Sequence, residues 1–203
     1  DNGRSVNRRT VLDLAPIVLL AATEVGYANI VRLVSRAFLE TPAGDPVHVE
    51  ADWLPPLSKD VIVLSGGALG PIGRAFAADR PDRAQARLAF LREAFGDRLY
   101  VELQRQAGYD RMLEAKTVAL AYEMDLPLVA TNEAFFLKAE DFEAHDALLA
   151  IAEGQILSND DRRRLTPDHH LKSRAEMTAL FADLPEALDN TVEIAERCSW
   201  YTQ

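Results

Sequence analysis

The sequence predicts an α/β fold in which short buried strands alternate with helices along a parallel sheet. Four short apolar runs have the length of buried strands, and helical segments separate them along the chain. Strands that alternate with helices in this way are typical of βα units. The last part of the chain shows helical patterns only, so we expect a helical carboxyl-terminal end.

The first predicted unit begins with the apolar run at residues 17–22. Thr23 and Glu24 then open a helix, which ends before Pro42. The apolar residues of this helix fall on one broad face, which is the pattern of a helix that packs against a core. They are Val25, Ile30, Val31, Val34 and Phe38.

The second strand is predicted at residues 61–64, and the glycine-rich stretch at residues 65–73 turns the chain into a helix. A longer helix follows from about Asp82 to Ala94, and Gly96 ends it. The inward-facing residues of this helix are expected to include Leu88 and Leu91.

The third strand is predicted at residues 99–103, a helix at residues 109–124 and the fourth strand at residues 126–130. These units are too few to close an eight-stranded barrel, so the sheet is either open or completed by chain outside this sequence. Beyond Thr131 only helices are expected, and we place them at about residues 141–153, 173–181 and 185–198.

The composition is that of a globular protein with excess acidic charge: 203 residues, 48% of them apolar, with a net charge of −10. A dedicated nucleic-acid-binding module is usually basic, so this class is disfavoured. No uncharged apolar run reaches the about 18 residues of a membrane helix, so no membrane association is expected. The single cysteine, Cys198, excludes an internal disulfide framework and a cysteine-rich zinc site, and fits a cytoplasmic location.

Polar side chains follow the third and fourth strands, at the edge where parallel βα folds gather their functional groups. Glu102, Gln104 and Gln106 alternate and are expected on one side, and Glu133 follows the fourth strand. The carboxylates of Glu102 and Glu133 could bind a divalent cation. Strand ends are also polar for solvation alone, so both interpretations stay open.

The glycines between residues 66 and 70 allow two interpretations. Their backbone amides could hold a phosphate group, although no P-loop lysine follows. Glycines are equally suited to a tight turn from strand to helix, which is the simpler interpretation.

The histidines show no metal-binding spacing, and His145 lies alone on a predicted helix. We expect His169 and His170 at the surface near a helix start, and Cys198 in the core. The basic run Arg162 to Arg164 is interpreted as a solvated face, with a phosphate contact as the alternative. The remaining histidine is His48.

Several segments resemble, in order, the amino-terminal PHP domain of the bacterial replicative DNA polymerase III alpha subunit. The similarity covers nearly everything after Leu14, and its several long matches make it specific. The matching segments are residues 26–37, 63–67, 100–104, 128–133, 141–151 and 180–198.

The resemblance implies a distorted (βα) barrel of the PHP type, which in this family begins further upstream with a His-x-His strand. We therefore expect a truncated barrel. The domains would be a polar leader at residues 1–15, a partial PHP barrel at residues 16–158 and a helical extension at residues 159–203 that leads toward the polymerase palm. The opening without methionine suggests an internal segment of a longer protein.

The metal pattern of the family is altered in this chain. Metal-binding relatives resemble Glu-Leu-Gln-x-His at the third strand, where this chain has Gln106 in place of the histidine. At the fourth strand they resemble Ala-Thr-Asn-Asp-x-His, where this chain has Glu133 and Phe135. Phenylalanine is no ligand and glutamine is a weak one. We therefore expect no zinc or manganese site and no catalytic residue, with Glu102 and Glu133 as residual carboxylates.

By this resemblance, the chain is a non-catalytic part of a polymerase whose nucleotide-transfer aspartates lie in the palm. It would support the polymerase fold and dock the proofreading exonuclease subunit of the holoenzyme, and it would meet DNA only through the parent polymerase. The alternative is a metal-dependent phosphoesterase or proofreading nuclease of the PHP class. A second alternative is direct DNA contact through Arg162 to Arg164, which the net charge of −10 disfavours.

Overall fold

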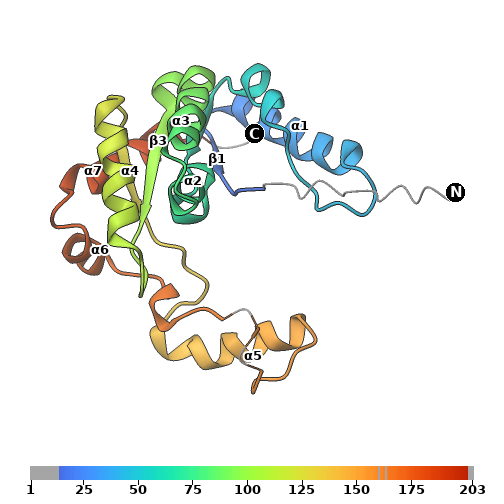
Figure 1. The fold of residues 1–203 in the computed structure, drawn as a ribbon, viewed down its shortest axis with the longest axis vertical. Helices are drawn as coiled ribbons and strands as arrows, with labels where there is room; N and C mark the ends of the chain where they lie inside the picture. Colours follow the sequence, from blue (N-terminus) through green and yellow to red (C-terminus); the bar gives the residue numbers. More distant parts are fainter. Residues whose placement is uncertain (1–13, 160, 163, 201–203) are drawn as a thin grey trace, which may run out of the picture.

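A four-stranded open sheet in the order β1-β2-β3-β4 forms the centre of the computed structural model, which describes residues 14–159, 161, 162 and 164–200 (Figure 1). Most of the predicted leader at residues 1–15, and Arg163 of the basic run, lie outside the described residues. The strands are β1 Val18–Ala21, β2 Val61–Leu64, β3 Leu99–Gln104 and β4 Leu128–Thr131.

The sheet is mixed, so the prediction of a parallel sheet is wrong for its first strand. The strands β2, β3 and β4 are parallel, whereas β1 runs antiparallel to β2, with Val18 opposite Leu64. An apolar run reveals burial but carries no information on strand direction. The first strand is also less buried than predicted, and Val18 is exposed, because it lies at the end of the strand order.

Helix α1 (Glu24–Glu40) begins as predicted at Thr23, whose Oγ1 accepts hydrogen bonds from the backbone N–H groups of Val25 and Gly26. Its orientation differs from the prediction. The buried residues are Gly26, Asn29, Leu33 and Ala37, while Val25, Val31, Val34 and Phe38 are exposed.

Close contact with residues 59 and 60 explains this orientation. A Cβ atom on Gly26 would lie 1.9 Å from the carbonyl oxygen of Asp60, so only glycine fits there. The Asn29 side chain donates to the carbonyl of Lys59 at 3.0 Å. The side of α1 that carries Gly26, Asn29, Leu33 and Ala37 therefore faces the rest of the fold, and Val25, Val31, Val34 and Phe38 lie on the exposed side.

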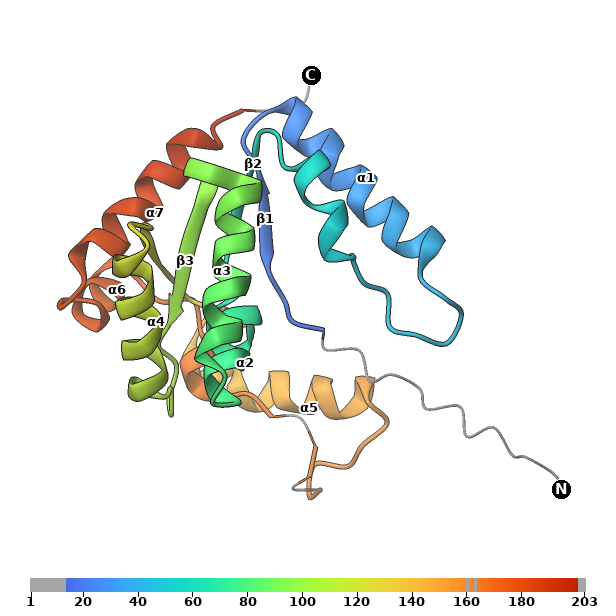
Figure 2. The same ribbon diagram turned by 45° about the horizontal axis from the view of Figure 1, so that its top comes forward.

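Three helices cover one face of the sheet (Figure 2). They are α2 (Pro71–Ala77), α3 (Pro81–Phe95) and α4 (Arg111–Glu123), and they confirm the predicted elements. Leu88 and Leu91 are buried as expected, and Gly96 ends α3 with a positive φ of 59°. Short 3₁₀ turns are η1 Ala51–Trp53, η2 Pro55–Leu57, η3 Gly67–Leu69, η4 Gly96–Arg98, η5 Ala139–Asp141 and η6 Pro167–His169.

The opposite face of the sheet carries the buried side chains of Ile62, Leu64, Tyr100 and Val129, which pack against Ile194. Ile194 belongs to helix α7 (Pro185–Arg197), which follows helix α6 (Arg174–Leu180). Because side chains alternate along a strand, Glu102 and Thr131 project from the same face as Tyr100 and Val129. This face leads directly to the site described below.

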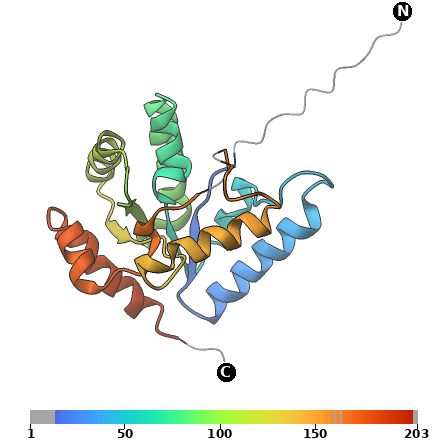
Figure 3. The ribbon, with the colours of Figure 1, turned by 90° about the horizontal axis from the view of Figure 1, so that it is seen from below.

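Helix α5 (Phe142–Ala152) follows β4 in the chain and lies away from the sheet (Figures 1 and 3). We call residues 137–168 the arm, and residues 132–136 and 169–172, which join it to the rest, the neck. Within the neck, the N–H of Phe135 donates to the carbonyl of His169 and the N–H of Leu171 donates to that of Phe136, both at 2.9 Å. These bonds hold the two neck segments side by side.

The start of α6 contains a carboxylate whose charge stabilises the fold. The backbone N–H and the hydroxyl of Ser173 each donate to Glu176 at 2.7 Å, and the His170 ring lies 3.2 Å away. These bonds, with those from Ser173 first, lower the pKa of Glu176 from 4.5 to about 2.

A lowered folded-state pKa stabilises the protein above pH 4.5, and this stabilisation is lost as the pH falls toward 2. We therefore expect Glu176→Gln to lower the melting temperature above pH 4.5, and the difference from wild type to shrink toward pH 2. Thermal unfolding followed by circular dichroism at a series of pH values measures this. A difference that stays constant over that range would contradict the assignment.

Among the described residues, no helix is long and apolar enough to cross a membrane.

Candidate functional site

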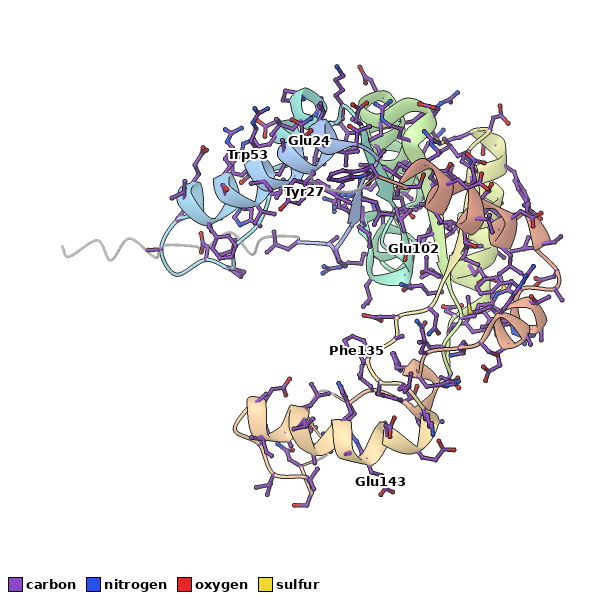
Figure 4. The ribbon with its side chains drawn as sticks, turned by 180° about the vertical axis from the view of Figure 1, so that it is seen from behind. Glu24, Tyr27, Trp53, Glu102, Phe135 and Glu143 are labelled. Atoms are coloured by element: carbon purple, nitrogen blue, oxygen red, sulfur yellow. The ribbon has the colours of Figure 1, made fainter. Side chains whose placement is uncertain are left out.

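The carboxylate of Glu102 lies at the carboxyl end of the sheet (Figure 4) and accepts hydrogen bonds from β3, from β4 and from the turn that follows β2. Its Oε2 accepts the backbone N–H of Gly66 at 3.0 Å. Its Oε1 accepts the Thr131 hydroxyl at 2.6 Å and the Gln104 amide at 3.2 Å. The side chain is only 3% exposed, so these donors replace water around the charge. We call these four residues the Glu102 network.

The backbone of the same residue is also fixed. The N–H of Glu102 donates to the Ser65 hydroxyl at 2.9 Å, and the N–H of Ser65 donates to the carbonyl of Tyr100 at 3.1 Å. Ser65, which directly follows β2, is thus hydrogen-bonded to β3 at two points. As predicted, Glu102 and Gln104 lie on one side of the strand, since their side chains bond to each other.

The glycine-rich turn positions this network. Gly66 has a φ of +83°, and a Cβ atom there would lie 2.0 Å from the carbonyl oxygen of Pro16. Gly67 has a φ of +57°, and a Cβ atom there would lie 2.6 Å from Oε1 of Gln104. The amide of Gly66 is bonded to Glu102, and that of Gly70 to the carbonyl of Gly67. These contacts favour the tight-turn interpretation over the phosphate site.

The other predicted site residues lie outside this network. Gln106 follows β3, and its amide nitrogen is buried without a hydrogen-bond partner in the described part of the chain. Glu133 follows β4 and is half-buried, and no hydrogen bond joins it to Glu102. Phe135 is 41% exposed, and its ring lies 5.8 Å from that of His145.

These side chains do not form the metal cluster that is expected of relatives with intact motifs. Within residues 14–159, 161, 162 and 164–200, no group of three or more His, Cys, Asp or Glu side chains could hold a metal ion. Both oxygens of Glu102 accept hydrogen bonds from neutral groups, and Phe135 has no lone pair to offer. The arrangement holds the ends of the strands together through hydrogen bonds.

Three of the histidines make hydrogen bonds or ring contacts with neighbouring residues of the fold. Nδ1 of His169 shares a hydrogen bond of 3.0 Å with the hydroxyl of Thr166, at the start of the η6 turn. The His169 ring lies 6.0 Å from that of Phe135. The His145 ring lies 5.8 Å from that of Phe135 and 5.4 Å from that of Phe136. His48 bonds to the carbonyl of Pro46 and to Glu50, which together raise the pKa of His48.

Arg162, the first residue of the basic run, is buried. The prediction that the run is a solvated face is therefore wrong for this residue. The Arg162 guanidinium is buried and makes a two-bond ion pair with Asp146 of α5, with Nη1 2.6 Å from Oδ1. Hydrogen bonds from Arg162 lower the pKa of Asp146. Arg164 is exposed, 3.9 Å from the same carboxylate. Arg162 therefore holds the arm together and is not positioned for contact with DNA.

Sequence reasoning missed a second buried arginine, Arg105, which directly follows β3. Its guanidinium binds two carboxylates at once: the shortest distances are 2.7 Å to Glu114 of α4 and 2.6 Å to Asp183, between α6 and α7. It also donates to the carbonyl of Leu180 at 2.7 Å and lies 4.5 Å from the centre of the Phe181 ring. Leu99, Val101 and Leu103 alternate on the same side of the strand as Arg105, but this alternation alone does not distinguish a buried arginine from one that follows the strand into solvent.

Comparison with known proteins gives two results. The PHP domain family matches residues 5–106. The curated relatives include DNA polymerase III subunit alpha of Caulobacter vibrioides, which is 46% identical over 186 residues, covering 91% of this chain and 16% of the relative. The same subunit of Pseudomonas aeruginosa is 43% identical over 189 residues and that of Escherichia coli K12 is 39% identical over 190 residues, each covering 92% of this chain and 16% of the relative. The chain thus spans about a sixth of the length of the relatives it matches.

Proposed function

This chain belongs to the PHP domain family, and on that premise we propose that it is a non-catalytic PHP region of a bacterial DNA polymerase III alpha subunit. In this role it supports the fold of the polymerase and docks the proofreading exonuclease subunit in the cytoplasm. DNA synthesis during replication is then carried out by the parent protein outside these residues, and this region meets DNA only through the parent.

One observation carries the non-catalytic part of the proposal. The carboxylate of Glu102 has both oxygens bound by neutral donors. By the resemblance described above, Phe135 stands where metal-binding relatives have a histidine ligand. Phosphoesterases of the metal-dependent type need a metal-bound water as nucleophile.

The docking part is supported by the arm. Helix α5 buries Asp146 against Arg162 and exposes Leu148 and Ile151, which is the reverse of the usual distribution. Exposed apolar side chains on a projecting element are typical of a protein contact. The relatives that share this region are subunits of a polymerase by name, so a protein partner is expected.

Metal content is the direct test of the non-catalytic proposal. The protein is purified without chelator, incubated with zinc or manganese, desalted and analysed by mass spectrometry, with a PHP protein that retains both motif histidines as the positive control. We expect no bound metal and no metal-dependent hydrolysis of a phosphoester. Stoichiometric metal with matching hydrolysis would favour the phosphoesterase alternative.

Docking is tested separately by titrating the proofreading exonuclease subunit into this chain and, in parallel, into the longer alpha subunit, with calorimetry as the readout. Saturable binding to both is expected. Binding to the longer subunit alone would place the docking surface outside these residues and contradict that part of the proposal.

A further inference from the structure

Helix α7 and the residues that follow it lie across the sheet and bond to its strands. We call residues 185–200 the strap. At β4, the amide of Asn190 donates to the carbonyl of Leu128 at 2.7 Å. At β3, the hydroxyl of Tyr100 donates to Glu193 at 2.7 Å. The buried side of the strap also packs against β2. The strap therefore contacts three strands before it reaches its own end.

The strap ends on β1, the strand at the open edge of the sheet. Nε1 of Trp200 donates to the carbonyl of Ala21 at 2.8 Å, and the Trp200 ring lies 5.9 Å from that of Tyr27 in α1. Leu20 of β1 and Cys198 of the strap pack against the same apolar cluster. Figures 2 and 3 both show the end of α7 close to the start of α1. Trp200 thus binds a strand that lies 179 residues earlier in the chain.

The part of the fold that Trp200 contacts is held loosely by its other neighbours. We call residues 14–40 the edge unit. Strand β1 has four residues, none of them fully buried, and within the described part of the chain it pairs with β2 alone. Among the buried residues of α1, Leu33 has the one large apolar side chain. Because local opening is easiest where little apolar surface is buried, the edge unit is expected to open before the rest of the sheet.

The edge unit also supports the Glu102 network. The backbone of Pro16 lies so close to the glycine-rich turn that a Cβ atom on Gly66 would lie 2.0 Å from the carbonyl oxygen of Pro16. The N–H of Gly66 is one of the donors to Glu102. Nearby, Arg74 of α2 donates to the carbonyl of Leu14. Opening of the edge unit would therefore remove the support on one side of the Gly66 turn.

We propose that the strap is a latch on the edge unit. While Trp200 is bound to β1, the edge unit stays closed over the Gly66 turn. When Trp200 is released, the edge unit opens as one body, while β2, β3 and β4 keep their helices. The order of the Glu102 network thereby depends on the far end of the chain. The latch involves neither the arm nor a bound subunit, so it is independent of the proposed docking function.

Hydrogen–deuterium exchange followed by mass spectrometry on the 203-residue chain tests the latch. Trp200→Phe keeps an aromatic ring and removes the N–H group, and we expect amide exchange in residues 18–40 to become about three- to tenfold faster. Trp200→Ala removes the ring as well, so an acceleration of at least about tenfold is expected. Exchange in residues 65–70 should also become faster, because the same opening uncovers the Gly66 turn. Exchange in α3 should keep its wild-type rate.

Tyr122→Phe is the matched control. The hydroxyl of Tyr122 on α4 donates to Glu186, which lies at the other end of α7. The variant thus removes one hydrogen bond from the same helix, far along the chain from Trp200. We expect exchange in residues 18–40 to stay at the wild-type rate, and circular dichroism checks that each variant is folded.

A latch must also respond to the unit that it holds, because coupling between two sites is reciprocal. The chain has two tryptophans, so in a Trp53→Phe background the fluorescence comes from Trp200 alone. In that background, Gly26→Ala places a Cβ atom 1.9 Å from the carbonyl oxygen of Asp60 and displaces α1. We expect the emission of Trp200 to shift to longer wavelength and acrylamide to quench it more strongly. Leu33→Val is a milder second variant for the same measurement, in case Gly26→Ala does not fold.

Four results would each overturn the proposal. Wild-type exchange of residues 18–40 in Trp200→Ala would show that Trp200 does not hold the edge unit. Exchange that becomes faster throughout the chain, or equally fast in Tyr122→Phe, would show a general loss of stability. Unchanged exchange of residues 65–70 would contradict the link to the Glu102 network. Unchanged Trp200 emission in the folded α1 variants would contradict the reciprocal coupling.

Discussion

Replacing Arg105 with methionine is expected to lower the free energy of unfolding by about 3 kcal/mol, the lower end of the range for breaking a buried ion pair. Arg105 is 7% exposed, and its guanidinium joins the end of β3 to α4 and to the segment between α6 and α7. Removing it leaves Glu114 with a largely buried charge. Asp183 is mostly exposed and regains water, so its share of the loss is small.

Urea unfolding at neutral pH measures this loss of stability, and two further variants show which part of it is due to the buried ion pair. Arg92→Met changes an exposed arginine on α3 in the same way and is expected to cost less than about 0.5 kcal/mol. Arg105→Lys keeps the charge but cannot bind both carboxylates with paired N–H groups, so an intermediate loss is expected. Equal stability of Arg105→Met and Arg92→Met would show that the buried pair does not stabilise the fold.

The ion pair of Arg105 with Asp183 also makes a small contribution to the pH dependence of stability. Hydrogen bonds from Arg105 lower the pKa of Asp183 below its usual value, so this carboxyl stabilises the fold at neutral pH and loses that effect as acid protonates it. The stability difference between wild type and Arg105→Met should therefore narrow at low pH. A difference that widens there would have the wrong sign.

Replacing Glu102 with leucine is expected to cost about 2–3 kcal/mol, because three donors lose their acceptor at once. The N–H of Gly66 cannot turn elsewhere, since its backbone is fixed against Pro16. The hydroxyl of Thr131 and the amide of Gln104 can rotate and recover part of the loss. Denaturant unfolding measures the change.

Glu133→Leu is the control for this variant, since Glu133 is a carboxylate at the same edge with no hydrogen bond to the Glu102 network. It is expected to change the free energy of unfolding by less than about 0.5 kcal/mol. Chelator should leave the wild-type midpoint unchanged, because the network stabilises through hydrogen bonds. A midpoint that falls with chelator would instead indicate a metal cross-link.

Much of the fold follows from local signals. The apolar runs at β2, β3 and β4, the Thr23 cap of α1 and the stop at Gly96 are local features, and each predicts its element to within a few residues. The proximity of Glu102 and Gln104 also follows from the sequence, because alternation along a strand places both on one side.

Other features depend on contacts far apart in the chain, which periodicity cannot reveal. The antiparallel direction of β1 depends on its partner, and the orientation of α1 depends on the fit of Gly26 against Asp60. The burial of Arg105 and Arg162 depends on carboxylates 78 and 16 residues away. A charged side chain is predicted to lie at the surface as long as its partner in the fold is unknown.

The neck has a consequence for how such a chain can change over time. The two ends of the arm lie side by side at the neck, where the backbones at Phe135 and His169 are hydrogen-bonded. Segments whose ends meet in this way can be lengthened, shortened or exchanged without moving what lies on either side. Between relatives, insertions and deletions should therefore gather between residues 137 and 168, while β4 and α6 keep their places. The arm is the part of this molecule whose length and sequence can change most without disturbing the sheet.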